Sequence, residues 1–483
     1  MTAAVKPISV FGIFITGYLA LALISFRFPY GQRLSEAPFA LHIIVCCVIG
    51  AFYLYLLHQL LAKRRKWFSV KLIFWVGILA RLVLFPSEPI LEDDAYRYFY
   101  DGALVNEGIN PYSTPPERVN AQTIMPDASI LGINPSAVKA DPELAFLRDE
   151  SYVQRVAYPH LGTIYPSVAQ IGFWVANRID AFNIQAWRIV LLLADLLTFL
   201  LLIRTLKKHA LPSSRVAIYW LNPILLVYGY NAGHMDVLMA PFLVASLFFM
   251  QRKQIVMSAT YMAAAVGTKL WPVILFPIIL KPYLRSPKRV VVACLVFILL
   301  CVAFLYPLLA EVGDPTSGLR QFSTTWRTNS FLFGILEDGL FYLQSADVLS
   351  ISDPNALARI TAYGGVVIVI AWRFTLSNSD IDSLISSCLW ISSALFLFAP
   401  TGYPWYLLWF LPWLVFRPVF PLLLLSCTLM LYPIRFVLID ADNEQIWLHV
   451  LNFFQFFPTL ALICFYKTRR LWLSEIRESD SLS

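Results

Sequence analysis

Long apolar stretches alternate with short polar segments along most of the chain, starting with residues 8–26. A membrane-spanning helix needs about 20 mostly apolar residues to cross roughly 30 Å of hydrocarbon, and most of these stretches approach that length. The first stretch lacks the small-residue cleavage site of a removable signal peptide, so we expect it to stay as a span. The pattern predicts about 14 spans, at residues 8–26, 41–62, 67–86, 187–205, 215–230, 235–250, 254–270, 271–284, 289–309, 359–376, 382–398, 402–416, 418–436 and 447–466.

Lysine and arginine residues occur in small clusters between the apolar stretches. Cytoplasmic loops carry such an excess of positive charge, so the clusters indicate the side that each loop faces. With these spans, every cluster falls on the cytoplasmic side and both termini are cytoplasmic. The clusters are Lys63, Arg64, Arg65 and Lys66; Lys207 and Lys208; Arg252 and Lys253; Arg285, Lys288 and Arg289; and Lys467, Arg469 and Arg470.

Residues 163–179, "TIYPSVAQIGFWVANRI", are apolar enough to be mistaken for another span. Counting them as a span would place Lys207 and Lys208 outside and invert every later basic loop. The proline near the start, the internal Gln and Asn, and the Trp favour the membrane surface. We therefore predict an interfacial or re-entrant helix here.

The distribution of polar segments divides the chain into three parts: N-terminal spans at 1–66, a central module at 67–310 and C-terminal spans at 311–483. The central module contains an outer loop, 87–186, in which turn signals alternate with short amphipathic stretches. We expect this loop to fold as an extracytoplasmic cap of amphipathic and interfacial helices. A second outer loop is expected at 311–358.

Composition narrows the function classes. Hydrophobic residues make up 59% of the chain and charged residues 14%, which excludes an ordinary soluble domain. The formal charge of +7 comes from the basic loop clusters, so it indicates membrane topology rather than nucleic-acid binding. The chain has no glycine-rich phosphate loop for a cytoplasmic nucleotide. An enzyme acting at the outer face would need a donor that has already crossed the membrane.

The segment "EDDAYRYFYDG" places Asp93 and Asp94 within a few residues of the membrane boundary. One interpretation is structural, with an aspartate capping a helix and Arg97 forming i,i+4 ion pairs with Asp93 and Asp101. The other interpretation is catalytic, because a carboxylate can take the proton of a hydroxyl that attacks a sugar carbon. The guanidinium of Arg97 could pair with a carboxylate or bind a phosphate in bidentate fashion.

A resemblance then appears in an ordered set of segments: "DDAYRYFYDG", "GINPY", "IYPSVAQ", "WLNPILLVYGYNAGHMDVLM", "AVGTKLWPVILFP" and "PTGYPWYLLWFLPW". Over about residues 67–420 this set resembles the bacterial polytopic mannosyltransferases of the GT-C glycosyltransferase superfamily. The lipid A aminoarabinose transferase and the protein O-mannosyltransferases are similar more distantly. This chain departs from the pattern in carrying two additional spans before the motif, and two crossings leave the motif on the same side.

The resemblance implies roles for individual residues. The catalytic aspartate of the superfamily corresponds to Asp94, the general base, with Asp93 as its neighbour. Asp236, in "NAGHMD", corresponds to a second acidic position that orients the acceptor or helps to hold a metal. Lys269 corresponds to a position that faces the donor phosphate, where a lysine would stabilise the leaving group. From residue type alone, Lys269 could also extend to the lipid headgroups.

Several other polar and aromatic residues have two interpretations each. His234 is a weaker candidate for the site, because one histidine and one carboxylate do not make a metal site. Tyr98, like Tyr96 and Tyr100, could stack on a sugar or belong to the aromatic belt of the membrane interface. The remaining candidates are Asn231 in a polar turn, Asp195 inside an apolar run, and Trp326, Arg327, Tyr403, Trp405 and Tyr406 as groove or interfacial residues.

The predicted function is that of an inverting glycosyltransferase in the plasma (inner) membrane, with its site on the extracytoplasmic side. The partners are a polyprenyl-phosphate sugar donor, with mannose expected and arabinose or glucose as alternatives, and a lipid-linked or envelope glycan acceptor, surrounded by membrane lipids and without nucleic acid. No cofactor is required, and Asp93 leaves a divalent cation as an option. The alternatives are a non-catalytic relative and a flippase of a lipid-linked sugar; transport predicts repeated halves and broken helices, and neither is visible in the sequence.

Overall fold

The computed structural model describes residues 7–28, 38–63, 68–119, 141–148 and 151–466. Within these ranges every regular element is a helix, and β-pairing is limited to an isolated parallel bridge between Thr328 and Thr401. The chain forms two compact units, which we describe separately. The first unit comprises Met1–Leu91, Leu202–Asn231 and Arg327–Ser483, and the second comprises Glu92–Leu201 and Ala232–Trp326.

Seven helices in the described ranges are long and apolar enough to cross a membrane, or up to eight if Leu225–Asn231 and Met235–Gln251 form one broken span. The protein is therefore a helical polytopic membrane protein, as the hydrophobic pattern predicts. The expected count of about 14 is not supported. The long helices are Phe39–Leu61, Ile184–Lys208, Pro287–Ala310, Pro354–Leu376, Ile381–Phe398, Phe420–Asp440 and Glu444–Phe465.

Short and broken helices explain the difference in count. Helix α3 (Val70–Leu84) has 15 residues, or about 22 Å at 1.5 Å per residue, which is less than the hydrocarbon thickness. The expected span at 402–416 divides into η11 (Pro404–Trp409) and α17 (Leu411–Phe416), each with a proline in its first turn. Proline lacks the N–H that a continuous helix requires, so an apolar stretch can contain a break that its average hydropathy does not reveal.

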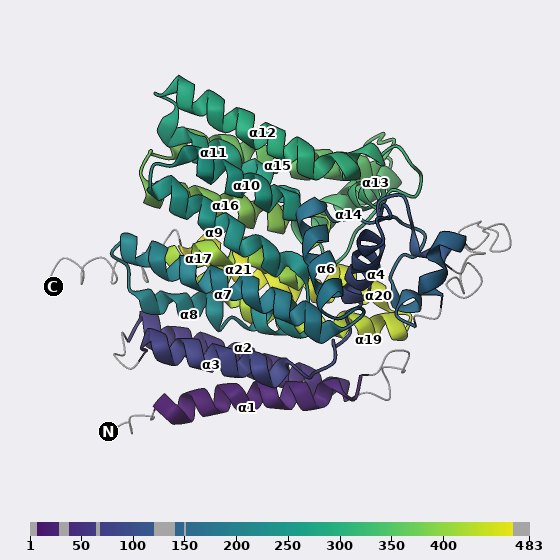
Figure 1. Cartoon of the computed structure of the whole chain (residues 1–483), viewed down its shortest axis with the longest axis horizontal. Coiled ribbons are helices and arrows are strands. Elements are labelled where there is room, and N and C mark those ends of the chain that lie inside the picture. The colour runs from purple at the N-terminus through teal and green to yellow at the C-terminus, as the bar shows by residue number, and fades with distance from the viewer. Residues whose placement is uncertain (1–6, 29–37, 64–67, 120–140, 149–150, 467–483) are drawn as a thin grey trace. The chain divides into compact units, whose positions relative to one another are not determined.

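The N-terminal part of the first unit is built on three helices, α1, α2 and α3, of which α1 packs against both others (Figure 1). The phenol of Tyr53 on α2 donates to the carbonyl of Ile218 at 2.6 Å, and the amide of Asn222 donates to the Tyr53 hydroxyl at 3.1 Å. The helix is interrupted here, and the bond from Tyr53 satisfies the backbone carbonyl group of Ile218 inside an apolar unit. The elements here are α1 (Pro7–Ser25), α2 (Phe39–Leu61), α3, η6 (Ser213–Val216), α8 (Ala217–Trp220) and η7 (Leu225–Asn231).

The C-terminal part of the first unit contains α14 (Leu332–Ser345), α15 (Pro354–Leu376) and α16 (Ile381–Phe398), which pack around Phe333, Ala358 and Ala362. It continues with η11, α17, α18 (Phe420–Thr428), η12 (Leu429–Leu431), α19 (Ile434–Asp440), α20 (Glu444–Ile446), η13 (Trp447–Leu451) and α21 (Asn452–Tyr466).

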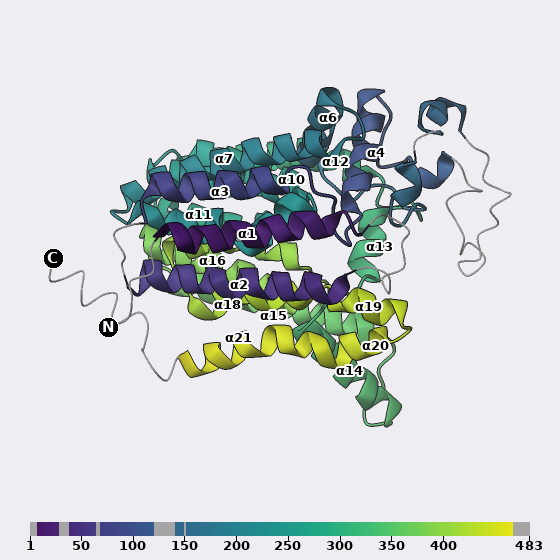
Figure 2. The ribbon, with the colours of Figure 1, turned by 90° about the horizontal axis from the view of Figure 1, so that it is seen from below.

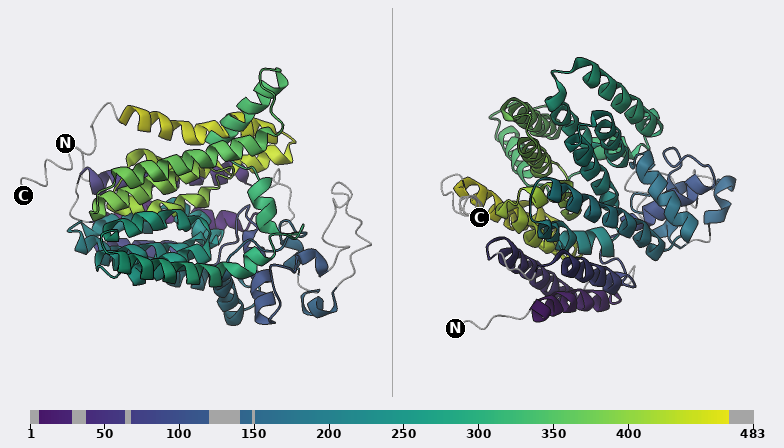
Figure 3. Two further views of the ribbon diagram at one scale, coloured as in Figure 1. Left: turned by 90° about the horizontal axis from the view of Figure 1, so that it is seen from above. Right: turned by 60° about the vertical axis from the view of Figure 1, so that its left-hand side comes forward.

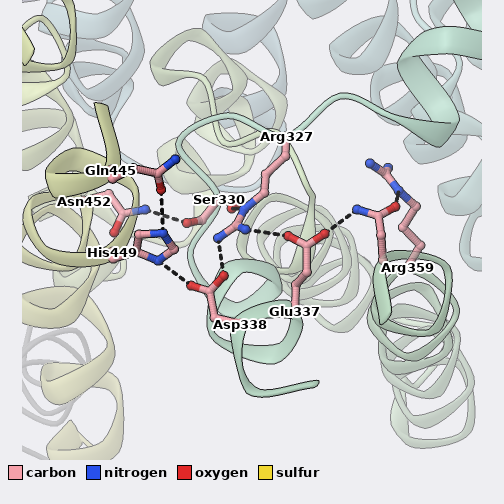
Figure 4. A network of polar contacts seen from close by, with 9 residues as sticks. Arg327, Ser330, Glu337, Asp338, Arg359, Gln445, His449 and Asn452 are labelled. Atoms are coloured by element: carbon pink, nitrogen blue, oxygen red, sulfur yellow. Dashed lines mark hydrogen bonds and ion pairs between the residues drawn. The ribbon is translucent and has the colours of Figure 1, made fainter. Parts of the chain in front are cut away.

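A polar network joins α14 to η13 in this part of the unit (Figure 4). The guanidinium of Arg327 contacts Glu337 at 2.7 Å and Asp338 at 2.9 Å. His449 places Nδ1 2.8 Å from Asp338 and Nε2 2.8 Å from the amide oxygen of Gln445. Arg327, singled out in the sequence as a groove residue, therefore makes structural ion pairs within the first unit.

The second unit contains the short helix α4 (Asp94–Asn106), which packs against α6 (Ser167–Ile179) (Figure 2). Helix α10 (Ile255–Thr268) packs against α9 (Ala240–Gln251) and α12 (Pro287–Ala310) (Figures 1 and 3). The other elements are η2 (Pro116–Arg118), η4 (Pro142–Leu147), η5 (Val153–Arg155), η8 (Met235–Met239), η9 (Trp271–Leu275), α11 (Phe276–Leu280), η10 (Lys281–Tyr283), α13 (Gly318–Thr324) and the start of α7 (Ile184–Lys208), which ends in the first unit.

Glycine permits the close approach of α4 and α6. A Cβ atom at Gly102 would lie 2.5 Å from the carbonyl oxygen of Phe173. The two backbones therefore touch at this point without an intervening side chain. Helix α6 has 13 residues, about 20 Å at 1.5 Å per residue, and is not among the candidate spans. That agrees with excluding 163–179 from the spans, and its interfacial or re-entrant location stays a prediction.

Parts of the topology prediction fall outside the described residues, namely the basic residues Arg64, Arg65, Lys66, Lys467, Arg469 and Arg470. The division into 1–66, 67–310 and 311–483 also stays a prediction, because the two compact units cut across these boundaries. The outer loop 87–186 does contain α4, α6 and three short helices, as expected of a folded segment. Its position outside the membrane remains a prediction.

Candidate active site

The start of α4 presents the two adjacent aspartates of the sequence motif. Leu91 has φ +58°, a left-handed conformation that is uncommon for a residue with a branched side chain, and the chain then enters the helix. Asp93 occupies the position before the helix, but its side chain caps no backbone N–H of the first turn. The capping interpretation of Asp93 therefore has no hydrogen bond to support it.

Asp94 begins α4 and is held by two neighbours. Its Oδ2 atom lies 3.2 Å from Nδ1 of His234 and accepts the hydroxyl of Tyr98 at 3.4 Å. Burial alone would raise the pKa of Asp94, but the imidazole of His234, the ammonium of Lys269 and the Tyr98 hydroxyl favour the carboxylate. The net pKa lies below the ordinary value, so Asp94 is ionised at neutral pH.

Asp93 has the opposite electrostatic character. The surrounding protein and the charges of Asp94 and Glu92 raise the pKa of Asp93 to about 7. The residue is also exposed, so water moderates this effect. The two neighbouring carboxyl groups thus differ, one being anchored and ionised and the other exposed and more basic. Such a separation of pKa values is typical of acid–base sites.

The turn before η8 places His234 and Asp236 in the site. Gly233 has φ +81°, and a Cβ atom there would lie 3.1 Å from the indole of Trp187. The Trp187 N–H donates to the carbonyl of Gly233 at 2.6 Å, which fixes the turn. A residue with a side chain would be strained at this backbone angle and crowded against Trp187, so the glycine of "NAGHMD" helps to position the imidazole that follows it.

Lys269 directly follows α10 and pairs with Asp236. Its Nζ atom donates to both carboxylate oxygens, at 2.8 Å and 3.0 Å. Asp236 is buried, with 2% of its side chain exposed, whereas Lys269 keeps 20% exposed. The second unit therefore contains both residues that the resemblance implied, in direct contact, with the ammonium accessible on one side.

The sequence suggests that Arg97, one turn after Asp94, pairs with a carboxylate or binds a phosphate. In the structure its guanidinium donates to backbone carbonyl groups instead. It donates to the carbonyls of Leu161, Ala157 and Tyr158 at 3.0, 3.2 and 3.1 Å. These bonds hold the loop 157–161 against α4. To bind a phosphate, Arg97 would have to leave these carbonyl groups.

The three tyrosines of α4 are all buried against protein. Tyr98 stacks on Phe173 with ring centroids 4.5 Å apart. Tyr96 stacks on Tyr152, and the hydroxyl of Tyr100 donates to the carbonyl of Thr114 at 3.2 Å. All three rings are therefore packed against other side chains or backbone of the second unit. Tyr98 also reaches the site, because its hydroxyl donates to Asp94.

Glu92 is a member of the site that the sequence interpretation missed. Its Oε2 atom lies 3.6 Å from Nε2 of His234, and only 8% of its side chain is exposed. The signal was visible as a third acidic residue in "EDD", but spacing along the chain cannot show which carboxylate meets a histidine more than a hundred positions later.

The remaining candidates from the sequence have partners of their own. The amide of Asn231 donates to Ser87 and to the carbonyl of Glu88, all within the first unit. Trp326 packs on Tyr158, with ring centroids 4.4 Å apart. Asp195 is buried in α7. Tyr403 stacks on Trp405 and packs edge-on against Tyr406.

Metal binding is an alternative role for the acidic residues. Among the residues that the structure describes, no group of three or more His, Cys, Asp or Glu side chains is arranged to hold a metal ion. A divalent cation shared with a substrate phosphate stays a prediction, since such a cation takes part of its ligands from the substrate.

Fold and site together define a helical polytopic membrane protein with a cluster of carboxylates, an imidazole and an ammonium in its second unit. Residues 162–284 match the model of a family described as alpha-(1->6)-mannopyranosyltransferase, N-terminal domain. This region contains His234, Asp236 and Lys269. It begins at residue 162 and therefore does not include Asp94.

A curated protein is similar to this chain over a longer range. The chain is similar to Alpha-(1->6)-mannopyranosyltransferase A of Mycobacterium tuberculosis, with 23% identity over 360 residues, which cover 68% of this chain and 62% of the relative. The chain thus spans less than two thirds of the relative's length. No solved structure matches it. The two matches confirm the resemblance to bacterial mannosyltransferases and support a glycosyltransferase.

Proposed function

We propose that this protein is an inverting glycosyltransferase of the GT-C type that moves mannose from a polyprenyl-phosphate donor to a lipid-linked or envelope glycan. The observation that carries the proposal is the anchored carboxylate of Asp94, held by His234 and Tyr98 at the start of α4. The similarity to a mannosyltransferase supports the sugar. The reaction takes place at the extracytoplasmic face of the plasma membrane, where lipid-linked donors are available.

Asp94 acts as the general base in this reaction. It accepts the proton of the acceptor hydroxyl while that oxygen forms a bond to the anomeric carbon, from the face opposite the phosphate. The bond between the anomeric carbon and the phosphate oxygen breaks, and its electron pair leaves with the polyprenyl phosphate. Because the attack and departure are on opposite faces, the anomeric configuration inverts. The lowered pKa of Asp94 keeps the base in its ionised form.

Lys269 offsets the charge that develops on the leaving phosphate. Its ammonium is already held by Asp236, so it is oriented before the donor binds. The proposed step requires no cofactor. A divalent cation, if bound, would be held by Asp93 and would supply positive charge to the leaving phosphate. Activity in the presence of EDTA, compared with added Mg²⁺ or Mn²⁺, distinguishes the two.

A flippase of the lipid-linked donor is the second candidate function. The helix break between η7 and η8 favours it, because discontinuous helices line the binding sites of many transporters. A flippase would move the donor lipid between leaflets without forming a glycosidic bond. A transferase would form the glycosidic bond even when all of the donor lipid is already in the outer leaflet.

The test uses the full-length protein purified into lipid nanodiscs with a synthetic polyprenyl-phosphate [³H]mannose and a short α-mannoside acceptor. We expect a mannosylated product, and Asp94→Asn should reduce its rate by at least about 100-fold while the protein still folds. Asp347→Asn, an exposed aspartate of the first unit, is the matched control and should keep full activity. Substantial turnover by Asp94→Asn would refute the assignment of the base. Donor movement in vesicles without product would favour the flippase.

A further inference from the structure

The imidazole of His234 lies between two carboxylates. Its Nδ1 atom is 3.2 Å from Oδ2 of Asp94, and its Nε2 atom is 3.6 Å from Oε2 of Glu92. The imidazole is fully buried, and the Glu92 side chain is 8% exposed. Asp94 has a role in the proposed reaction, whereas Glu92 has none so far.

This arrangement selects one protonation state of His234. A neutral imidazole carries a proton on one nitrogen and a lone pair on the other, so its lone pair would face a negatively charged oxygen. The imidazolium form carries a proton on each nitrogen and directs positive charge to both carboxylates. Because the imidazole is removed from water, these attractions are weakly screened. The geometry therefore favours imidazolium.

The other charged groups around the imidazole do not change this conclusion. Asp93 adds a further carboxyl group next to Asp94, and the ammonium of Lys269 is paired with Asp236. Tyr98 contributes a hydroxyl that donates to the same Oδ2 atom of Asp94. Oδ2 of Asp94 therefore has two neighbours, the imidazole of His234 and the hydroxyl of Tyr98.

From this geometry we propose that Glu92 is a positioning residue for the sugar transfer: acting through His234, it holds Asp94 in the orientation and the ionised form that accept the acceptor's proton. The inference rests on the proposed function of Asp94. Without the carboxylate of Glu92, the imidazole loses one of its two negative neighbours and gives up a proton more readily. Its Nδ1 atom can then carry a lone pair where it faces Asp94, and the attraction that holds the Asp94 carboxylate is lost.

A structural role for Glu92 would have different consequences. An acidic residue just before α4 also interacts favourably with the positive end of the helix dipole. A residue that acts only in this way would affect thermal stability but not the protonation of His234. The protonation of His234 is therefore the measurement that separates the two roles.

The first experiment observes the imidazole directly. The chain has six histidines, so ¹⁵N-histidine-labelled protein in detergent or nanodiscs gives few ring signals, and loss of a signal in His234→Gln assigns it. In Glu92→Gln, the midpoint at which the His234 ring becomes neutral should fall by about one pH unit or more. Glu92→Asp, whose carboxylate is one methylene shorter, should give an intermediate midpoint. It also serves as the test should Glu92→Gln fail to fold. Equal midpoints in wild type and these variants would overturn the proposal.

The second experiment measures transfer. Glu92→Gln should lower kcat by about 10- to 100-fold with little change in donor KM, and the alkaline limb of the pH profile should move to lower pH. Glu92→Asp should recover part of kcat. Glu88→Gln, an exposed glutamate four residues earlier, is the control and should leave the profile unchanged. An unchanged pH profile in Glu92→Gln would contradict the proposal. If wild type transfers no sugar, the proposed function fails, and the ring midpoints still decide whether Glu92 controls His234.

Discussion

Lys269 reaches both carboxylate oxygens of Asp236, at 2.8 Å and 3.0 Å. The aspartate is buried and the lysine is partly accessible, so the pair is closed on one side and open on the other. A cation balanced by one buried carboxylate can still attract an anionic group from its open side. The same pair could also serve only to connect η8 with the end of α10, and mutations can distinguish the two roles.

Replacing Lys269 by methionine should destabilise the protein by about 3 kcal/mol, because it leaves a buried carboxylate without its cation. In Lys269→Met combined with Asp236→Asn, both charges are gone and most of the stability should return. Transfer activity should stay low in both variants if Lys269 stabilises the leaving phosphate. Thermal unfolding and the mannose transfer assay provide the two measurements. Recovery of activity in the double variant would show that the pair is structural.

Arg97→Lys should loosen the loop 157–161. Lysine keeps the positive charge but lacks the planar fork with which the guanidinium donates to three carbonyl groups. Hydrogen exchange at these backbone amides should become faster, and kcat should fall with little change in the donor KM. Arg320→Lys, at an exposed position, serves as the control. A higher donor KM with unchanged exchange would instead indicate that Arg97 contacts the phosphate.

Asp93→Asn should stabilise the protein in a pH-dependent manner. The folded pKa of Asp93, about 7, lies above the ordinary value of 3.8, so the fold favours the protonated carboxyl group. Its contribution to stability is fully present below pH 3.8 and is lost as the pH rises through about 7. Because the residue is exposed, we expect a gain below about 1 kcal/mol at pH 8, or roughly 2 °C in Tm, and no gain near pH 4. A gain of equal size at both pH values would refute this explanation.

Gly233→Ala should reduce both stability and transfer. It forces a side chain into the left-handed conformation at φ +81° and places the new Cβ atom 3.1 Å from Trp187. We expect about 2 kcal/mol of destabilisation and a displaced His234. Gly108→Ala is a matched control, since Gly108 has φ +73° but no atom within 4 Å of an added Cβ. It should lose a similar backbone contribution and keep its kcat. Equal loss of kcat in both variants would exclude the Trp187 contact as the cause.

The hydrophobic pattern predicts helix positions well where an apolar run is continuous. The expected spans at 41–62 and 289–309 correspond to Phe39–Leu61 and Pro287–Ala310. The pattern fails where the backbone breaks inside an apolar run, as at η11 and α17, because hydropathy averages over prolines that interrupt the hydrogen bonding. The span count was therefore less predictable than the helix positions.

The candidate site follows a similar division. Asp94, His234, Asp236 and Lys269 are chemically recognisable in their motifs, and the structure places them in one unit. The partners of Arg97 are backbone carbonyl groups, which every residue has and no sequence motif can indicate. Glu92 was recognisable as an acid, but its contact with His234 depends on how the turn before η8 folds.

Gly102 has a consequence for how related chains can vary. Gly102 lies directly against the carbonyl group of Phe173, so no side chains separate α4 from α6 at this point. A larger residue therefore cannot be accommodated by moving a neighbouring side chain. Sequence drift elsewhere on these helices can be accommodated one side chain at a time. At position 102 this is not possible, so a related chain with a larger residue there must have α6 in a different position. The first turn of α4 would then also be oriented differently.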